Sequence, residues 1–213
     1  MKIRFALISV LSAIILTGCA PISAAYKIEP APAVSEGTTK VVVPLFVDLR
    51  SEEEKSGAGA GLFNRSTKDA IYSEKVNEAV TRALIDELRA RGINAVERGD
   101  ADYRVTGEIR HYRAMIVPPR TAFIPYVSYV TWLWTKDRIS VGVEMDVKLE
   151  GPTGEMLKET YKLSSNTEEW VGLAGLSSSA RRLDSEGLVK VLRAGLKSVL
   201  TKTADDISSK LKN

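Results

Sequence analysis

The chain has 213 residues, with 30 lysines and arginines against 27 aspartates and glutamates, one histidine and one cysteine. This length fits one domain with a linker or an insertion, and the near-neutral charge argues against a nucleic-acid-binding protein, which would carry a clustered basic surface. One His and one Cys exclude a His-based metal cluster and an internal disulfide, so we expect no metal centre and no cofactor.

Residues 1–18 have the organisation of a signal peptide. Lys2 and Arg4 form a short positive region, and residues 5–16 form an apolar run. That run is shorter than the ~20 residues that a membrane-spanning helix needs. Removal of residues 1–18 takes away two bases and no acid, which leaves 28 basic and 27 acidic side chains in the mature chain.

The signal peptide ends in a motif that can direct acylation. Leu16-Thr17-Gly18-Cys19 resembles the lipobox of bacterial lipoproteins, which needs small residues before the cleaved bond and a thiol after it. The resemblance implies that the Cys19 sulfur receives a diacylglyceryl group and that its freed amine receives a further acyl chain, such as palmitate. Two or three acyl chains anchor a protein stably, whereas one is marginal. The alternatives are an ordinary secretory signal and an apolar helix with an incidental thiol.

The residue after Cys19 indicates whether the lipoprotein is sorted to the inner or the outer membrane. Ala20 stands where an Asp would resemble the inner-membrane retention signal of enteric bacteria. Outer-membrane sorting, with the domain on the periplasmic face, is therefore implied, and the inner membrane is the alternative. Residues 19–37 contain Pro21, Pro30 and Pro32 without hydrophobic periodicity, which predicts a flexible tether. Residues 38–213 then form a single domain.

A strand is predicted over residues 40–49, with Pro44 indicating an edge position or a bulge. The polar, Gly-rich stretch 48–73 is predicted as a flexible loop, in which Glu52-Glu53-Glu54 is a solvated run. A phosphate-binding loop is disfavoured because Leu62 stands where the dinucleotide fingerprint needs a third Gly, and because no Gly-Lys-Ser/Thr follows.

Apolar residues at three- and four-residue spacing predict a helix over 73–91, capped by Ser73 and followed by Gly92. Strands are predicted at 93–97 and 102–117, and the second alternates between an apolar and a polar face. His111 continues this strand, and a partly buried or rim-exposed histidine is favoured over a catalytic one.

An aromatic insert occupies residues 118–136. Its part 118–134 holds five of the chain's fourteen aromatic residues, and Pro125 disfavours a regular helix through it. Three interpretations stay open: a lid over the core, an exposed protein-binding surface, or a segment that dips into the bilayer interface. The candidate interaction residues are Phe123, Tyr126, Tyr129, Trp132 and Trp134.

Residues 138–149 alternate most regularly, and a hairpin turn at 151–154 leads into a strand over 155–163. Glu144 and Asp146 share a polar face with basic residues, so cross-strand ion pairs are favoured over a catalytic carboxylate pair. A final helix is predicted over 184–211. The order β-α-β-β-insert-β-β-α predicts an α+β fold, in which two amphipathic helices cover one face of a mixed or antiparallel sheet.

Four short motifs in residues 38–165 resemble YajG-type lipoproteins, and more loosely LptE-like and CsgG-like envelope proteins. They are a strand ending Asp48-Leu49-Arg50, a helix ending Leu88-Arg89-Ala90-Arg91-Gly92, Ala101-Asp102-Tyr103, and Val105-Thr106-Gly107-Glu108-Ile109. The resemblance implies the fold and the envelope compartment, and it transfers no site. The aromatic insert departs from the YajG pattern.

The sequence carries no enzyme signature. We therefore expect a non-catalytic accessory or assembly component, which is anchored to the membrane through Cys19 and binds an envelope protein. The alternative is a lipid- or glycan-binding module with a cleft beneath residues 118–134. A homo-oligomer is neither indicated nor excluded.

Overall fold

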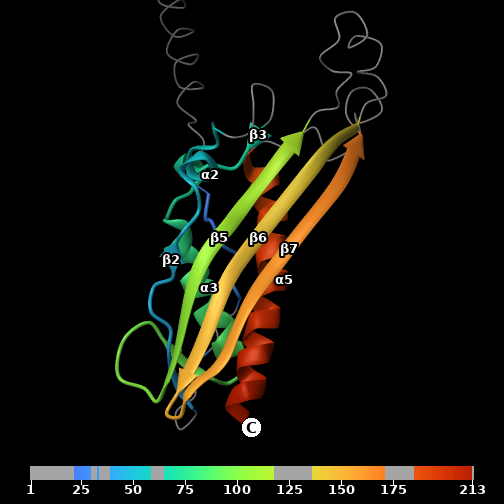
Figure 1. Cartoon of the computed structure of the whole chain (residues 1–213). Helices are drawn as coiled ribbons and strands as arrows, with labels where there is room; N and C mark the ends of the chain where they lie inside the picture. The colour runs from blue at the N-terminus through green and yellow to red at the C-terminus, as the bar shows by residue number, and fades with distance from the viewer. Residues whose placement is uncertain are drawn as a thin grey trace, which may run out of the picture.

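The computed structural model describes residues 22–29, 33, 39–58, 65–117, 136–170 and 185–212. They form the predicted α+β fold, in which α3 (Val76–Ala90) and α5 (Ser185–Lys212) cover one face of a mixed sheet (Figure 1). None of the helices within these ranges is both long and apolar enough to cross a membrane. Several predicted positions lie outside the described residues: Leu16, Thr17, Gly18, Cys19, Phe123, Tyr126, Tyr129, Trp132 and Trp134.

The sheet is built around three long strands. β5 (Tyr103–Val117), β6 (Lys136–Gly151) and β7 (Gly154–Trp170) pair antiparallel in that order. On the other side of β5, β1 (Lys40–Val42) pairs parallel with both β5 and β4 (Asn94–Val96), which gives the order β4-β1-β5-β6-β7. The short strands β2 (Val47–Asp48) and β3 (Arg65–Ser66) also pair with β5.

The core lies between the sheet and the two helices, as the alternation predicts. Every second residue of β6, from Ile139 to Leu149, is buried at 3 % exposure or less. The inner face of α5 meets this row, and Leu192, Leu196 and Leu200 are fully buried there. Transfer of such side chains from water stabilises the fold by about 1.5–3 kcal/mol each.

The helix boundaries agree with the sequence at one end of α3 and differ at the other. Gly92 follows α3 with φ +78°, the left-handed conformation that favours glycine after a helix. The predicted cap Ser73 is wrong, because α3 begins at Val76 with Lys75 at its N-cap and no side-chain cap bond. The backbone N–H of Ser73 instead donates to the carbonyl of Ile22 at 2.9 Å.

The predicted strand 40–49 is interrupted at Pro44, which separates β1 from β2. The stretch after it is more ordered than a flexible loop. It contains α2 (Glu52–Ser56), β3 and the 3-10 helix η2 (Asp69–Ile71). The solvated-run prediction is wrong for Glu54, whose exposure is only 6 %.

Part of the segment predicted as a tether is packed into the domain. Ala24 and Ala25 are buried, and the backbone N–H of Ile22 donates to the carbonyl of Ile71 at 3.0 Å. The Tyr26 hydroxyl donates to Glu87 of α3 at 2.7 Å. Small side chains fit here between the helices and the sheet, so a stretch without periodicity still contributes to the core.

Candidate functional site

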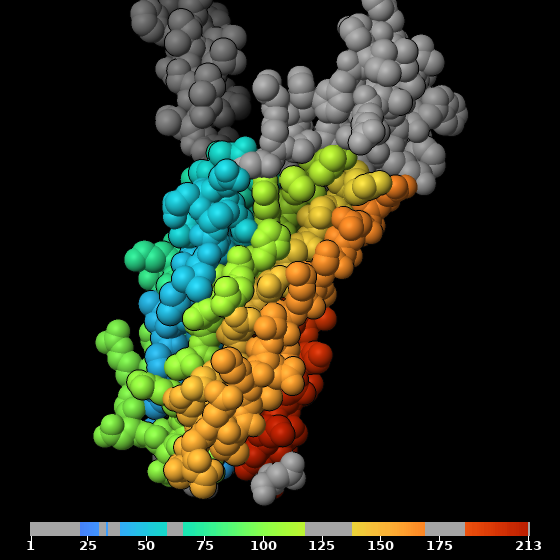
Figure 2. Space-filling model, in the orientation of Figure 1, coloured from blue at the N-terminus to red at the C-terminus, as the bar shows by residue number. Residues whose placement is uncertain are grey.

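The outer face of β5, β6 and β7 is covered by paired charges, and it faces the viewer in Figure 2. Lys162 contacts Glu144 at 2.7 Å, which joins β7 to β6. Asp146 pairs with Arg110 of β5 and accepts a hydrogen bond from Thr160 at 2.7 Å. The Thr160 bond, together with Arg110, lowers the pKa of Asp146. Glu144 and Asp146 are therefore parts of a cross-strand ion-pair surface, as the sequence favours.

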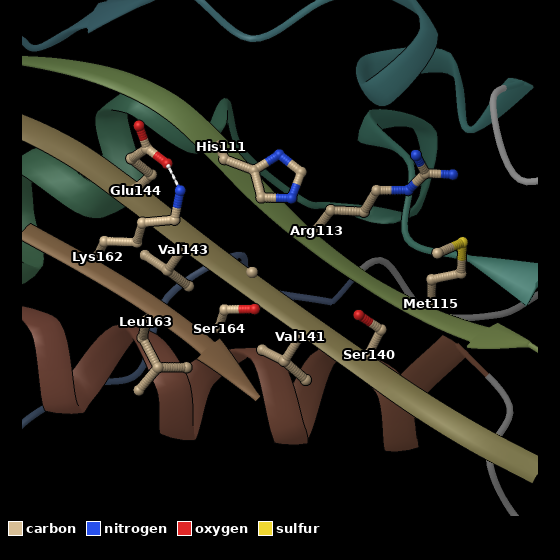
Figure 3. Close-up of a pocket in the computed structure, with 11 residues that line it drawn as sticks. His111, Arg113, Met115, Ser140, Val141, Val143, Glu144, Lys162, Leu163 and Ser164 are labelled. Atoms are coloured by element: carbon tan, nitrogen blue, oxygen red, sulfur yellow. Dashed lines mark ion pairs between the residues drawn. The ribbon is translucent and has the colours of Figure 1, made fainter. Parts of the chain in front are cut away.

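A shallow niche of about 240 Å³ interrupts this face around Gly142 (Figure 3). A Cβ at Gly142 would collide with the His111 ring, so glycine lets the imidazole lie across β6. His111 and Arg113 line the niche from β5, and the Glu144–Lys162 pair closes one end. The niche is small compared with the ~300–1,000 Å³ of typical ligand pockets.

Among the described niche residues, Arg113 carries buried side-chain atoms without a hydrogen-bond partner. Its Nε and Nη2 atoms are buried and have no partner among the described residues. Buried donors without a partner cost about 1–3 kcal/mol each. The Nε and Nη2 edge of a guanidinium can bind a carboxylate. In Arg50 these two atoms donate to the two carboxylate oxygens of Asp48 at 2.9 and 2.8 Å.

Arg50 connects the end of β2 to the segment that leads into α3. Its side chain is 1 % exposed, and its guanidinium also donates to Asp69 at 2.9 and 3.0 Å. Burial alone would raise the pKa of Asp48, but the hydrogen bonds and the charge of Arg50 outweigh burial and hold that pKa below its ordinary value. The Asp48-Leu49-Arg50 motif therefore has a structural role: it joins the end of β2 to the segment before α3.

Glu54 holds the bulge of β5. The register of β5 against β6 shifts between Ile109 and His111, and the Glu54 carboxylate lies there. One oxygen accepts from the backbone N–H of Tyr112 at 2.5 Å, and the other lies 2.6 Å from Nδ1 of His111. The His111 side chain is 43 % exposed, which agrees with the predicted rim-exposed strand histidine.

An apolar stripe runs along the edge of the sheet beside β5. Leu45, Val47 and Leu49 are 45, 54 and 49 % exposed, and they are the large hydrophobic residues that stand exposed within the described ranges. Phe46 between them is buried, and it fixes the stripe in place. Its backbone N–H donates to Thr81 Oγ1 at 3.0 Å, and its carbonyl accepts from Asn77 Nδ2 at 3.2 Å.

The sequence did not single out this stripe as a binding surface. Its signal was present in the alternation of residues 45–49, because those residues that face away from the buried Phe46 are all large and apolar. The apolar run in residues 40–49 predicts only a strand. Across the described ranges, no three His, Cys, Asp or Glu side chains gather as a metal site would require. The cleft of the alternative ligand-binding function lies outside the described residues.

No known protein family matches the chain, and no curated protein matches it either. One solved structure shares its fold. A Xanthomonas campestris protein of family DUF330 aligns with a TM-score of 0.51 at 11 % identity, over 89 % of this chain and 93 % of that one. At this identity the likeness shows the fold alone.

Two further neighbours align less well. Rare lipoprotein B of Shewanella oneidensis has a TM-score of 0.40 at 11 % identity, over 80 % of this chain and 98 % of that one. A PelC dodecamer of Paraburkholderia phytofirmans has a TM-score of 0.36 at 13 % identity, over 80 % of this chain and 92 % of its own.

Proposed function

We propose that the mature chain is a lipoprotein of the bacterial envelope, anchored through Cys19 and held on the periplasmic face of the outer membrane. There it acts as a non-catalytic accessory subunit that binds another envelope protein. The lipobox-like residues 16–19 and Ala20 support the anchor and the compartment. The neighbour named as a lipoprotein is consistent with this function but carries no argument of its own.

The observation that carries the binding function is the apolar stripe Leu45, Val47 and Leu49. Protein interfaces combine an apolar centre with a polar rim. Here the stripe adjoins a concavity lined by Val47, Glu108 and Arg110 together with other charged residues of the ion-pair surface. The hydrogen bonds that Phe46 donates to Thr81 and accepts from Asn77 hold the stripe in place, so little ordering entropy is lost on binding.

The binding surface is tested by a charge at its centre. Val47→Lys should abolish recovery of the partner when the lipidated protein is captured from detergent-solubilised envelopes after cross-linking. Val47 is exposed, so circular dichroism should show an unchanged fold. Thr153→Lys, in the exposed turn between β6 and β7, is the matched control and should keep the partner. If Val47→Lys recovers the same partner in the same yield, the stripe is not the binding surface.

The anchor is tested separately. With a secretory signal whose cleavage needs no thiol in place of residues 1–18, Cys19→Ala should move the protein from the membrane fraction to the soluble periplasmic fraction without unfolding it. Fractionation followed by circular dichroism of the released protein measures both. If the variant is released but unfolded, the thiol belongs to the core, and a variant that stays membrane-bound contradicts anchoring through Cys19.

A further inference from the structure

The chain just after the proposed anchor is fixed to the domain. Ile22 lies beside Tyr72 as a parallel bridge, and Arg193 of α5 donates to the carbonyl of Ser23 at 2.9 Å. Tyr112 of β5 donates its hydroxyl to the carbonyl of Ala24. Ile22, the first residue that the structure describes, is thus packed against the domain three positions after Cys19.

The direction of this segment indicates where Cys19 must be. Ser23 meets Arg193, and Tyr26 lies 5.9 Å under the ammonium of Lys197, which is one turn further along α5. The chain therefore approaches the start of α5 when it is followed back from Tyr26 toward Cys19. The start of α5 lies at the upper end of the domain in Figure 1.

The same end holds the termini of the long strands. Tyr161, in the first half of β7, donates to Asp206 in the last part of α5 at 3.0 Å, so the start of α5 lies toward the end of β7. Trp170 at that end of β7 pairs with Lys136, and Val117 pairs with Arg138. We call the end of the domain that carries Val117, Lys136, Trp170 and Ser185 the strand-end face.

The reach of the chain from Ile22 to Cys19, compared with the length of β6, shows which end of the domain can contact a membrane. Three residues from Cys19 to Ile22 span at most about 10 Å. The 16 residues of β6 cover about 50 Å at ~3.3 Å per residue, so the Gly151–Gly154 turn is far beyond this reach. An acylated Cys19 can lie near the strand-end face and cannot lie near the turn.

We propose that the strand-end face rests on the lipid surface, so that the domain stands end-on and projects the Gly151–Gly154 turn into the periplasm. The inference rests on the proposed acylation of Cys19, and it goes beyond anchoring because it fixes the orientation. β5 ends at Val117 and β6 begins at Lys136, so the sheet is continuous with both ends of the aromatic insert at the lipid-facing end. The partner is the phospholipid headgroup region of the bilayer that holds the anchor.

The test uses the full lipidated protein in vesicles of phosphatidylethanolamine and phosphatidylglycerol with a nitroxide on the headgroup. Acylation consumes the native thiol, so Thr167→Cys and Thr153→Cys each offer one site for a bimane label. Both residues are exposed, Thr167 three residues from the end of β7 and Thr153 in the distant turn. The nitroxide should quench most of the fluorescence at position 167 and leave position 153 unquenched.

A longer linker between Cys19 and Ile22 tests the orientation of the domain separately from its anchoring. An insertion of about 20 Gly and Ser residues after Pro21 gives a coil of roughly 25 Å, so quenching at position 167 should fall severalfold while the protein still floats with the vesicles. A protein that floats with equal quenching at 167 and 153, or with none at 167, overturns the orientation and leaves the anchor standing. A protein that does not float overturns the proposed anchor itself.

Discussion

Two buried charges organise the stretch between the first strands and α3. Arg50 binds the carboxylates of Asp48 and Asp69, and Glu54 receives the backbone N–H of Tyr112 at the bulge of β5. A buried charge is tolerated only when it is paired and hydrogen-bonded. These residues therefore stabilise a region that would otherwise have few apolar contacts, and their loss should be costly.

Glu54→Ala should lower the free energy of unfolding by about 1–3 kcal/mol, because the buried N–H of Tyr112 loses its acceptor. Urea unfolding of the Cys19→Ala protein measures the difference. Glu53→Ala on the same short helix is the control, because Glu53 is exposed and should change stability by no more than about 0.5 kcal/mol. Equal effects of the two substitutions would contradict a structural role for Glu54.

Asp48 adds a dependence on pH. Its folded pKa lies below its ordinary value, so its contribution to stability is present above about pH 4 and is lost as the pH falls through the folded pKa. Asp48→Asn should therefore be less stable than the parent at pH 7, and this deficit should shrink toward pH 3. Urea unfolding at both pH values measures it, with the exposed Asp100→Asn as the control. A deficit that is independent of pH would contradict the paired carboxylate.

The sequence predicted neither buried charge, because Arg50 and Glu54 stand in a polar, Gly-rich stretch that has the composition of a loop. Their burial depends on Asp69 and on the bulge before Tyr112, which are distant in sequence. The resemblance to lipoproteins did single out Asp48-Leu49-Arg50. The structure gives that motif a physical reason, namely a bidentate pair at the end of β2.

At the scale of elements, one glycine decides how β2 packs on β5. A Cβ on Gly107 would collide with the ring of Phe46, which is 1 % exposed. The Val-Thr-Gly-Glu-Ile motif thus needs a glycine at its centre because an aromatic ring lies against the strand.

Gly107→Ala should destabilise the domain by about 1–3 kcal/mol through overpacking. Phe46→Leu leaves space above the strand, so the double variant should lose less than the sum of the two single variants. Thermal unfolding of the four proteins measures this coupling. Strictly additive losses would show that the ring and the strand do not meet.

Hydrophobic periodicity predicted the long elements well and the short ones poorly. β6 and α5 agree with the sequence to within a few residues, because each has one face in the core. β7 continues to Trp170 rather than ending at residue 163, since residues 164–168 are all exposed at the sheet edge and have no alternation to detect. Residues 22–26 form no regular element, so no local signal marked their packing.

At the scale of the whole molecule, the fold brings three distant parts of the chain to one end. The start of α5, the end of β7 and the Val117–Lys136 boundary of the aromatic insert meet there, close to the first packed residue after the proposed anchor. No sequence pattern places these segments together, because the arrangement depends on sheet pairing and on the contact of residues 22–26 with both helices. The apolar stripe lies along the side of the domain and is exposed to solvent.

We propose that Cys19 begins the mature chain and carries its lipid. Mass spectrometry of the amino-terminal peptide, taken from the membrane fraction of a bacterial host, tests it most directly. The predicted peptide starts at Cys19, with a diacylglyceryl thioether on sulfur and an acyl group on the amine. A mature chain that starts at another residue, or one whose Cys19 carries a free thiol, would contradict the account.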